Sequence, residues 1–261
     1  MDDSRLLLTD EIWDRLAAAL SGLKSRAGAP PKQTDRDFIE AVLFLARTGE
    51  PWRDLPERFG RWDAVYQRFR RWEKAGRWRA LFERLPEDLQ EVHTVFFDSS
   101  VIRAHPHAAG APQQRGGQEA QALGRSRGGF GTKIHAAAAD ERTALAVVLT
   151  PGQAGDAPTY PELIAAVPEG CPVDAAAADK SYDSDAIRAD LKGRGIEPVI
   201  PPLACRKEAI PYDKKTYRQR NRVERLFSKL KQFRRIATRY DKLDLTFLAF
   251  IHLTAALIMI R

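Results

Sequence analysis

The 261-residue sequence is poor in cysteine, since it has only Cys171 and Cys205, and these two show no metal-binding or redox spacing. A disulfide framework is therefore excluded, and we expect a reducing, cytoplasmic compartment. The N-terminus lacks the basic segment that begins a secretory signal. The apolar run at 245–260 contains three polar residues and is shorter than the about 20 residues of a membrane span. We expect it to form a buried terminal helix.

Charge is distributed unevenly along the sequence. Apolar residues make up 44% of the chain, enough for a folded core, and the formal net charge is +7. Between 214 and 242 there are twelve lysines and arginines but only two acids, Glu224 and Asp241, so this segment carries +10 and the remainder −3. A solvated charged helix usually has mixed signs. We therefore interpret the segment as a surface for the phosphates of a nucleic acid.

Residues 9–85 are expected to be helical. Thr9 and Thr34 are typical helix caps, and each is followed by apolar residues at helical spacing. A break rich in glycine and proline at 28–31 separates the two helices that follow these caps.

A third helix is expected after Gly60, with arginines on the side opposite its apolar face, among them Arg68 and Arg71. Short helices joined by tight turns are typical of a helix-turn-helix module. We therefore predict an all-helical, helix-turn-helix-like domain over 1–88, in which Arg68 and Arg71 contact DNA. The alternative is that these arginines only face solvent.

The second part of the chain alternates between strand-like and helical patterns. A three-stranded meander followed by crossover connections predicts an α/β fold, a mixed five-stranded sheet flanked by helices. The long aperiodic connection at 103–129 ends in a small, basic stretch, and Arg127 in that stretch is expected to approach a phosphate. The expected strands are 92–97, 133–139, 144–149, 173–178 and 196–200, and the expected helices are 161–167, 185–192, 214–238 and 243–260.

Two aspartates are expected at equivalent places in this sheet. Asp98 follows the apolar run 95–97, Asp179 follows the run 176–178, and each is predicted at the C-terminal end of its strand. Open α/β sheets place their chemistry at this edge. Aspartate is also a common turn residue and helix cap, so each of the two taken alone has a purely structural alternative.

A third acid, Glu224, is the only acid in the basic helix predicted at 214–238. At about 100° per residue, Tyr217, Arg220 and Lys231 share its side of the helix. Such a stripe suits a metal-bound phosphodiester, because the carboxylate can bind the metal while the cations hold the flanking phosphates. The alternative is that Glu224 only pairs with a neighbouring arginine. The DNA contacts predicted from this segment are Tyr217, Arg220, Arg222 and Lys231.

Three carboxylates without a thiol cluster favour a hard, oxygen-binding metal ion. We therefore predict Asp98, Asp179 and Glu224 as catalytic, metal-binding residues for two Mg²⁺ ions, with Mn²⁺ as a substitute. Two such ions activate an attacking oxygen and stabilise a leaving one. They are also required electrostatically, because three uncompensated carboxylates would repel a DNA phosphate.

These acids lie in motifs that resemble those of bacterial insertion-sequence transposases. The spacing Tyr217-x2-Arg220-x3-Glu224-x6-Lys231 resembles the signature around their catalytic glutamate. The segments FFDSS at 96–100 and ADKSYD at 178–183 resemble the two strand-end aspartates of the same enzymes.

Two further segments are similar to the insertion-sequence-five family, in its IS427/IS1031-like group. They are RSRGGFGTKIH at 125–135, which adds Lys133 as an expected DNA contact, and WRDLP at 52–56. One departure is Ser181, where the family more often has glycine. If the backbone at this position requires positive φ, a serine is strained there.

The resemblance implies an RNase H-like domain over 89–261 with an Asp-Asp-Glu triad, and an N-terminal domain that helps bind the terminal inverted repeats. It implies a DNA endonuclease in which metal-activated water cuts double-stranded DNA at the transposon end. The released 3′-OH then attacks target DNA, with no covalent enzyme intermediate. It further implies a homodimer on paired ends, associated with the bacterial nucleoid.

Two other functions remain open from the residues. The first is a DNA-binding regulator that has kept the scaffold and lost catalysis, against which stands the presence of all three acids. The second is a stand-alone nuclease or junction resolvase, in which a helical end-binding domain would be superfluous.

Overall fold

The computed structural model describes residues 6–23, 33–86, 89–112, 116–117, 119–208 and 210–261. The predicted break at 28–31 lies outside these residues. The chain forms two compact units. The first comprises Met1–Leu85, His105–Gly110 and Leu230–Arg261, and the second comprises Pro86–Ala104 and Ala111–Lys229.

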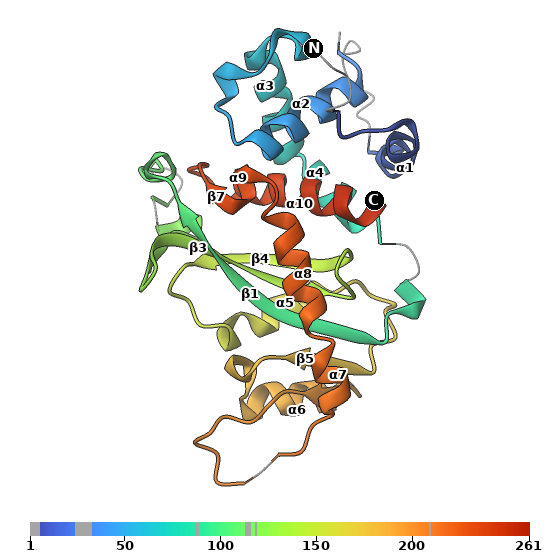
Figure 1. Ribbon diagram of the computed structural model, residues 1–261, viewed down its shortest axis with the longest axis vertical. Coiled ribbons are helices and arrows are strands. Elements are labelled where there is room, and N and C mark those ends of the chain that lie inside the picture. Colours follow the sequence, from blue (N-terminus) through green and yellow to red (C-terminus); the bar gives the residue numbers. More distant parts are fainter. Residues whose placement is uncertain (1–5, 24–32, 87–88, 113–115, 118, 209) are drawn as a thin grey trace. The chain divides into compact units, whose positions relative to one another are not determined.

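The helices predicted for the N-terminal part are confirmed in the first unit (Figure 1). Both predicted caps form, because the hydroxyls of Thr9 and Thr34 accept the backbone N–H groups of Ile12 and Asp37 at 3.3 and 3.1 Å. The second helix ends at Gly49, whose φ of +74° is the left-handed conformation that glycine adopts most readily. The helices here are α1 (Asp10–Leu20), α2 (Asp35–Thr48), α3 (Trp62–Lys74) and α4 (Arg77–Glu83).

The terminal apolar run forms α10 (Asp244–Ile260), which is buried along nearly its whole length, as predicted. It packs against α1 to α4 and against the short helix α9 (Arg234–Ala237). No helix in the described part of the chain is long and apolar enough to cross a membrane. A helix that is apolar on all sides needs packing partners on all sides, so α10 joins the N-terminal helices in the first unit. The compact units therefore divide the chain differently from the predicted boundary at 88/89. The functional division at that boundary stays a prediction.

The second unit contains the predicted mixed, RNase H-like sheet, with its five main strands in the order β4-β3-β1-β5-β6. The pairs β4/β3 and β3/β1 are antiparallel, and the pairs β1/β5 and β5/β6 are parallel. Two short strands, β2 (Gly124–Ser126) and β7 (Thr238–Arg239), were not predicted. The main strands are β1 (Thr94–Ala104), β3 (Gly129–Ala138), β4 (Ala144–Pro151), β5 (Ala175–Ala178) and β6 (Glu197–Val199).

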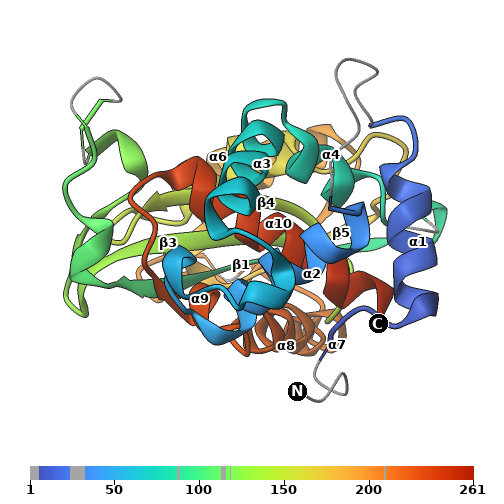
Figure 2. The ribbon, with the colours of Figure 1, turned by 90° about the horizontal axis from the view of Figure 1, so that it is seen from above.

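Helices cover both faces of this sheet. In Figure 2, α7 (Lys214–Arg218) and α8 (Asn221–Leu230) lie on one side of it and α6 (Asp185–Gly193) on the other. The core between the sheet and the helices α5 (Tyr160–Ala165) and α6 contains Val95 and Phe97 of β1.

Phe96 faces the opposite side of the sheet, where the guanidinium of Arg222 on α8 lies 6.0 Å from its ring. Side chains alternate along a strand. Asp98 therefore shares the α8 face with Phe96, and Ser99 shares the α5 face with Phe97.

Candidate active site

The register of the two parallel strands places the predicted aspartates next to each other. Phe97 of β1 pairs with Ala178, the last residue of β5, so Asp98 and Asp179 come next on adjacent strands. The prediction that Asp98 ends its strand is wrong, because β1 continues to Ala104 through antiparallel pairing with β3. Instead, the strand that ends beside Asp98 is its parallel partner β5, whose last residue is Ala178. The edge of the sheet is therefore open at this point.

Asp98 is largely buried and has two hydrogen-bond donors. Its side chain is 17% exposed, Arg220 Nη1 donates to Oδ2 at 2.9 Å, and the Ser99 N–H donates to Oδ1 at 2.9 Å. Burial raises the pKa of Asp98, and the negative charges of Asp179 and Glu224 act in the same direction. The arginine and the Ser99 amide oppose this but do not outweigh it. The three predicted acids are thus electrostatically coupled.

Glu224, on α8, is linked to Asp98 through a shared arginine. Arg220 Nη2 donates to Glu224 Oε1 at 2.5 Å, while its other terminal nitrogen holds Asp98. The guanidinium also lies 5.8 Å from the ring of Tyr217. The structure therefore brings together the three predicted acids with Tyr217 and Arg220.

The single helix predicted at 214–238 is wrong, because α7, α8 and α9 are separated by turns at 219–220 and 231–233. The helix α8 buries Val223, Leu226 and Phe227 at helical spacing, whereas α7 buries no residue that could extend the packing. Lys231 lies in the second turn, is exposed and belongs to the first unit. The structure therefore does not place it on a stripe with Glu224.

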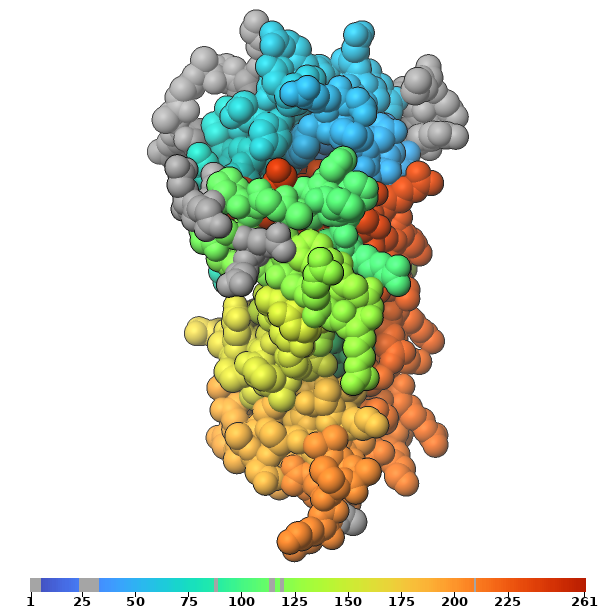
Figure 3. Space-filling model, turned by 90° about the vertical axis from the view of Figure 1, so that its left-hand side faces the viewer, coloured from blue at the N-terminus to red at the C-terminus, as the bar shows by residue number. Residues whose placement is uncertain are grey.

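The other predicted DNA contacts fall into different environments. Arg71 on α3 is exposed, and Arg127 is exposed in the turn between β2 and β3, which is lime-green at the surface in Figure 3. Arg222 lines a cavity of about 470 Å³ together with residues 91–94, which lead into β1, and the β3–β4 turn. Arg68 and Lys133 instead contact groups of the protein itself.

Arg68 is 7% exposed, forms an ion pair with Asp35 and donates to the carbonyl groups of Gln33 and Thr34. Lys133 Nζ donates to the Ala154 carbonyl at 2.5 Å and to Asp156 at 3.0 Å. In this conformation neither cation is presented to a phosphate. The helical periodicity that suggested Arg68 and the motif resemblance that suggested Lys133 do not reveal an acid that approaches from a distant segment.

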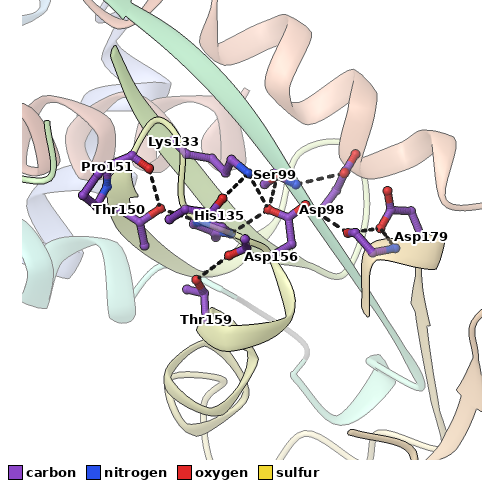
Figure 4. A network of polar contacts seen from close by, with 12 residues as sticks. Asp98, Ser99, Lys133, His135, Thr150, Pro151, Asp156, Thr159 and Asp179 are labelled. Atoms are coloured by element: carbon purple, nitrogen blue, oxygen red, sulfur yellow. Dashed lines mark hydrogen bonds and ion pairs between the residues drawn. The ribbon is translucent and has the colours of Figure 1, made fainter. Parts of the chain in front are cut away.

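A fourth acid, Asp156, was missed by the sequence analysis. It follows β4 in the segment PGQAGD at 151–156, and Figure 4 shows it at the centre of a polar network behind the two predicted aspartates. It accepts hydrogen bonds from the hydroxyls of Ser99 and Ser181 at 2.8 and 2.9 Å. It lies five residues beyond Pro151, the last residue of β4, so the signal that identified Asp98 and Asp179, an acid directly after an apolar run, does not identify it.

Ser181 is not strained, contrary to the conditional expectation. It lies in a short 3₁₀ turn, Lys180–Tyr182, that is capped by Asp179, and Ala122 is the one described non-glycine residue with positive φ. The serine hydroxyl instead gives the site contacts that a glycine lacks.

The donors present suit a divalent cation by their chemistry. Asp98, Asp179 and Glu224 supply hard carboxylate oxygens. The buried hydroxyl of Tyr182 has no hydrogen-bond partner among the described residues, and the nearby acids Asp156, Asp98 and Asp179 help burial to raise its pKa. No group of three or more His, Cys, Asp or Glu side chains in the described ranges is arranged to hold a metal ion as it stands. The charge that neutralises the acids here is that of Arg220.

Two family models match this chain. Residues 93–259, well over half of the chain, match the family described as "Transposase DDE domain", and residues 8–82 match "Putative transposase of IS4/5 family (DUF4096)". The "Putative transposase for insertion sequence element IS6501" of Brucella ovis is 35% identical over 134 residues, which are 50% of this chain and 98% of that protein. The "Insertion element IS402 uncharacterized 16.2 kDa protein" of Burkholderia cepacia is 33% identical over 42% of this chain and 79% of its own length.

Among solved structures, the chain resembles one titled "Cryo-EM structure of piggyBac transposase synaptic complex with hairpin DNA (SNHP)". The identity is 14% and the TM-score 0.40, over 77% of this chain and about half (49%) of that one. A likeness at this level supports no statement about function. The family matches cover both the helical N-terminal part and the sheet that carries Asp98 and Asp179. The chain therefore belongs to the IS4/IS5 family of DDE transposases.

Proposed function

We propose that the chain is an insertion-sequence transposase, of the IS427/IS1031-like group, that cuts DNA at the ends of its element and joins the 3′-OH ends to target DNA. Asp98, Asp179 and Glu224 are its catalytic acids. The observation that carries the proposal is the convergence of these acids. The two aspartates directly follow Phe97 and Ala178, which are register partners on β1 and β5, and one guanidinium links Asp98 to Glu224.

The same three carboxylates would hold a pair of Mg²⁺ or Mn²⁺ ions. When bound, such ions supply charge neutralisation of the phosphodiester and activation of the attacking oxygen. The chain's own contribution is to position the acids: the backbone N–H of Ser99 fixes one oxygen of Asp98. Arg220 balances the negative charge of Asp98 and Glu224 and, once released from them, can contact a phosphate.

We propose that double-stranded DNA is bound by exposed cations of both units. Arg71 and Arg127 are exposed, and α7 and α8 carry further exposed cations in the most basic part of the sequence. The terminal inverted repeats and the target DNA are the two substrates, and a homodimer acts on paired ends. This activity belongs in the bacterial cytoplasm, at the nucleoid.

The test is an in vitro cleavage assay with the full chain, Mg²⁺ and a labelled duplex that carries the element's own end. We expect Asp98→Asn, Asp179→Asn and Glu224→Gln each to lower strand cleavage by more than the roughly 100-fold typical of residues that only support a metal ligand. DNA binding should persist in all three. Glu162→Gln is the matched control, because Glu162 is an exposed acid on α5.

Three outcomes would contradict the proposal in different ways. Tight binding of the end without any cleavage by the wild-type chain would favour the DNA-binding regulator. Cleavage of branched or random DNA without preference for the element's end would favour the stand-alone nuclease. Cleavage that persists in one of the three variants would remove that residue from the catalytic set.

A further inference from the structure

Asp156 holds two serines that are related to the predicted catalytic aspartates in the same way. Its Oδ1 accepts the hydroxyl of Ser99 at 2.8 Å, and its Oδ2 accepts the hydroxyl of Ser181 at 2.9 Å (Figure 4). The backbone N–H of Ser99 donates to Asp98 Oδ1 at 2.9 Å, and the backbone N–H of Ser181 donates to Asp179 Oδ1 at 2.9 Å. One carboxylate thus reaches both aspartates, through one serine each.

This arrangement follows from the sheet register. Ser99 points to the face opposite Asp98, and its antiparallel partner on β3 is His135. Lys133, two residues before His135, therefore points to the same face, where its ammonium meets Asp156 at 3.0 Å. Asp156 approaches from the loop after β4 and contacts the sheet from behind the predicted catalytic edge.

Asp156 is held as an anion although its side chain is only 15% exposed. Burial opposes ionisation, but the hydrogen bonds from Ser99, Lys133 and Ser181 outweigh it and lower the pKa of Asp156. Lys133 thus supplies the compensating charge. A carboxylate that is kept ionised and buried is a fixed acceptor for both hydroxyls.

We propose that Asp156 is a positioning residue that sets the relative placement of Asp98 and Asp179 through the hydroxyls of Ser99 and Ser181. The proposal deepens the proposed function and rests on it. A metal pair shared by two aspartates requires both carboxylates at a fixed spacing, and residues that orient metal ligands typically affect metal affinity or activity by about 10–100-fold. Lys133 supports the same arrangement through its ion pair with Asp156.

The hydroxyl of Ser181 lies between two carboxylates, those of Asp156 and Asp179. It contacts Asp179 at Oδ1, yet a hydroxyl has one proton and can donate to only one of the two carboxylates at a time. When it donates to Asp156, Asp179 keeps only the backbone N–H on that oxygen. The carboxylate of Asp179 is then available to a cation, whereas Asp98 is still held by Arg220.

The test measures Mn²⁺ affinity of the full chain without DNA, by titration calorimetry, together with end binding and end cleavage. Asp156→Ala should weaken Mn²⁺ binding and lower the cleavage rate by about 10-fold or more, with DNA-end affinity unchanged and cleavage partly restored at high Mn²⁺. Ser99→Ala combined with Ser181→Ala should have the same effect. Adding Asp156→Ala to that pair should then cost little more, because the same contacts are already gone.

Asp190→Asn is the matched control. Asp190 also accepts a hydroxyl, that of Tyr160 at 2.7 Å, and a cation, Arg194 at 2.8 Å, but it contacts none of the predicted catalytic acids. Its variant should leave Mn²⁺ affinity unchanged. Ser181→Gly removes only the Ser181 hydroxyl and leaves that of Ser99, so its effect should be smaller than that of Asp156→Ala.

Two results would overturn the positioning role. The first is additivity of the Asp156 and double-serine changes, which would mean that Asp156 acts by another route. The second is an Asp156→Ala variant with a lower melting temperature but unchanged Mn²⁺ affinity. If the wild-type chain binds no Mn²⁺ and cuts no DNA, the proposed function fails. The positioning role is then decided by crystal structures of wild type and Asp156→Ala, and unchanged carboxylates of Asp98 and Asp179 would refute it.

Discussion

Replacement of Arg220 by glutamine gives the sharpest test of how the acidic centre is neutralised. The arginine and Asp98 are each 17% exposed and 2.9 Å apart, whereas Glu224 is 54% exposed. Breaking a buried ion pair costs about 3–5 kcal/mol, and an exposed pair contributes about 0–1 kcal/mol. The Asp98 contact lies between these limits, so we expect Arg220→Gln to lower the free energy of unfolding of the second unit by about 2 kcal/mol without divalent cations. The melting temperature should fall by roughly 4–8 °C.

The same contact competes with any cation that binds the carboxylates. If the guanidinium must leave before a cation enters, about 2 kcal/mol of contact energy corresponds to roughly 30-fold in affinity. We therefore expect Arg220→Gln to bind Mn²⁺ roughly 30-fold more tightly than the wild type, and Mn²⁺ to recover most of the lost stability. DNA cleavage should still be impaired, because the variant lacks a cation for the phosphate.

The assay combines thermal unfolding in chelator and in Mn²⁺ with calorimetric titration of Mn²⁺. The matched control is Arg206→Gln. Arg206 bridges Asp183 and Asp185 at 2.6 Å each, and its side chain is 21% exposed, but it is not connected to the predicted triad. It should lose stability alike in chelator and in Mn²⁺, without a change in Mn²⁺ affinity. Equal or weaker Mn²⁺ binding by Arg220→Gln would refute the competition between guanidinium and cation.

Further predictions concern the two arginines of α3 and the buried histidine of β3. Arg68→Gln should destabilise the first unit by about 3 kcal/mol, because Asp35 loses its buried partner. Arg71→Gln should change the free energy of unfolding by less than about 0.5 kcal/mol and should weaken binding of element-end DNA. Chemical denaturation measures the first effect and a binding titration the second. Equal losses of stability in Arg68→Gln and Arg71→Gln would contradict the assignment of Arg68 to the interior and Arg71 to the DNA-binding surface. Burial lowers the pKa of His135 to about 4, from an ordinary value of 6.5. The unfolded chain therefore binds more protons between these pH values, and stability should fall by up to about 3 kcal/mol as the pH drops from 6.5 to 4. His135→Gln, which keeps a polar partner for Thr150, should flatten this pH dependence in urea denaturation at pH 7 and pH 4.5, and an unchanged pH profile would show that His135 is not the titrating group.

The strand-end aspartates show how far sequence patterns reach and where they stop. An apolar run followed by an acid placed Asp98 and Asp179 at the chemically useful edge of the sheet, and the parallel register confirms that they come next to each other. The same rule does not find Asp156, because this acid lies five residues beyond the end of β4. The extent of β1 was not predicted, because Asp98, Ser99 and Ser100 interrupt the apolar run and the strand continues beyond them by pairing with β3.

The environment of Lys133, in contrast, could not be predicted from local sequence patterns. Its alternation within β3 predicts that it lies on one face of the sheet, but which face depends on the pairing of Lys133 with Val101, a contact between distant segments. That pairing turns its ammonium towards Asp156 and away from the face of α8. A shift of one residue in register would have presented it on the same side as the predicted triad.

Local periodicity and capping chemistry by themselves determined most of the helices, the main strands, the positions of the acids and the basic segment around Glu224, but not the breaks between α7, α8 and α9. These features depend on neighbours within a few residues, so the order of the side chains encodes them directly. Only the tertiary structure decided that α10 returns to the N-terminal helices, that Arg220 joins Asp98 to Glu224 and that Asp156 holds two serines. Each of these contacts joins residues far apart in the chain, and its formation depends on sheet register and on which apolar surfaces bury one another.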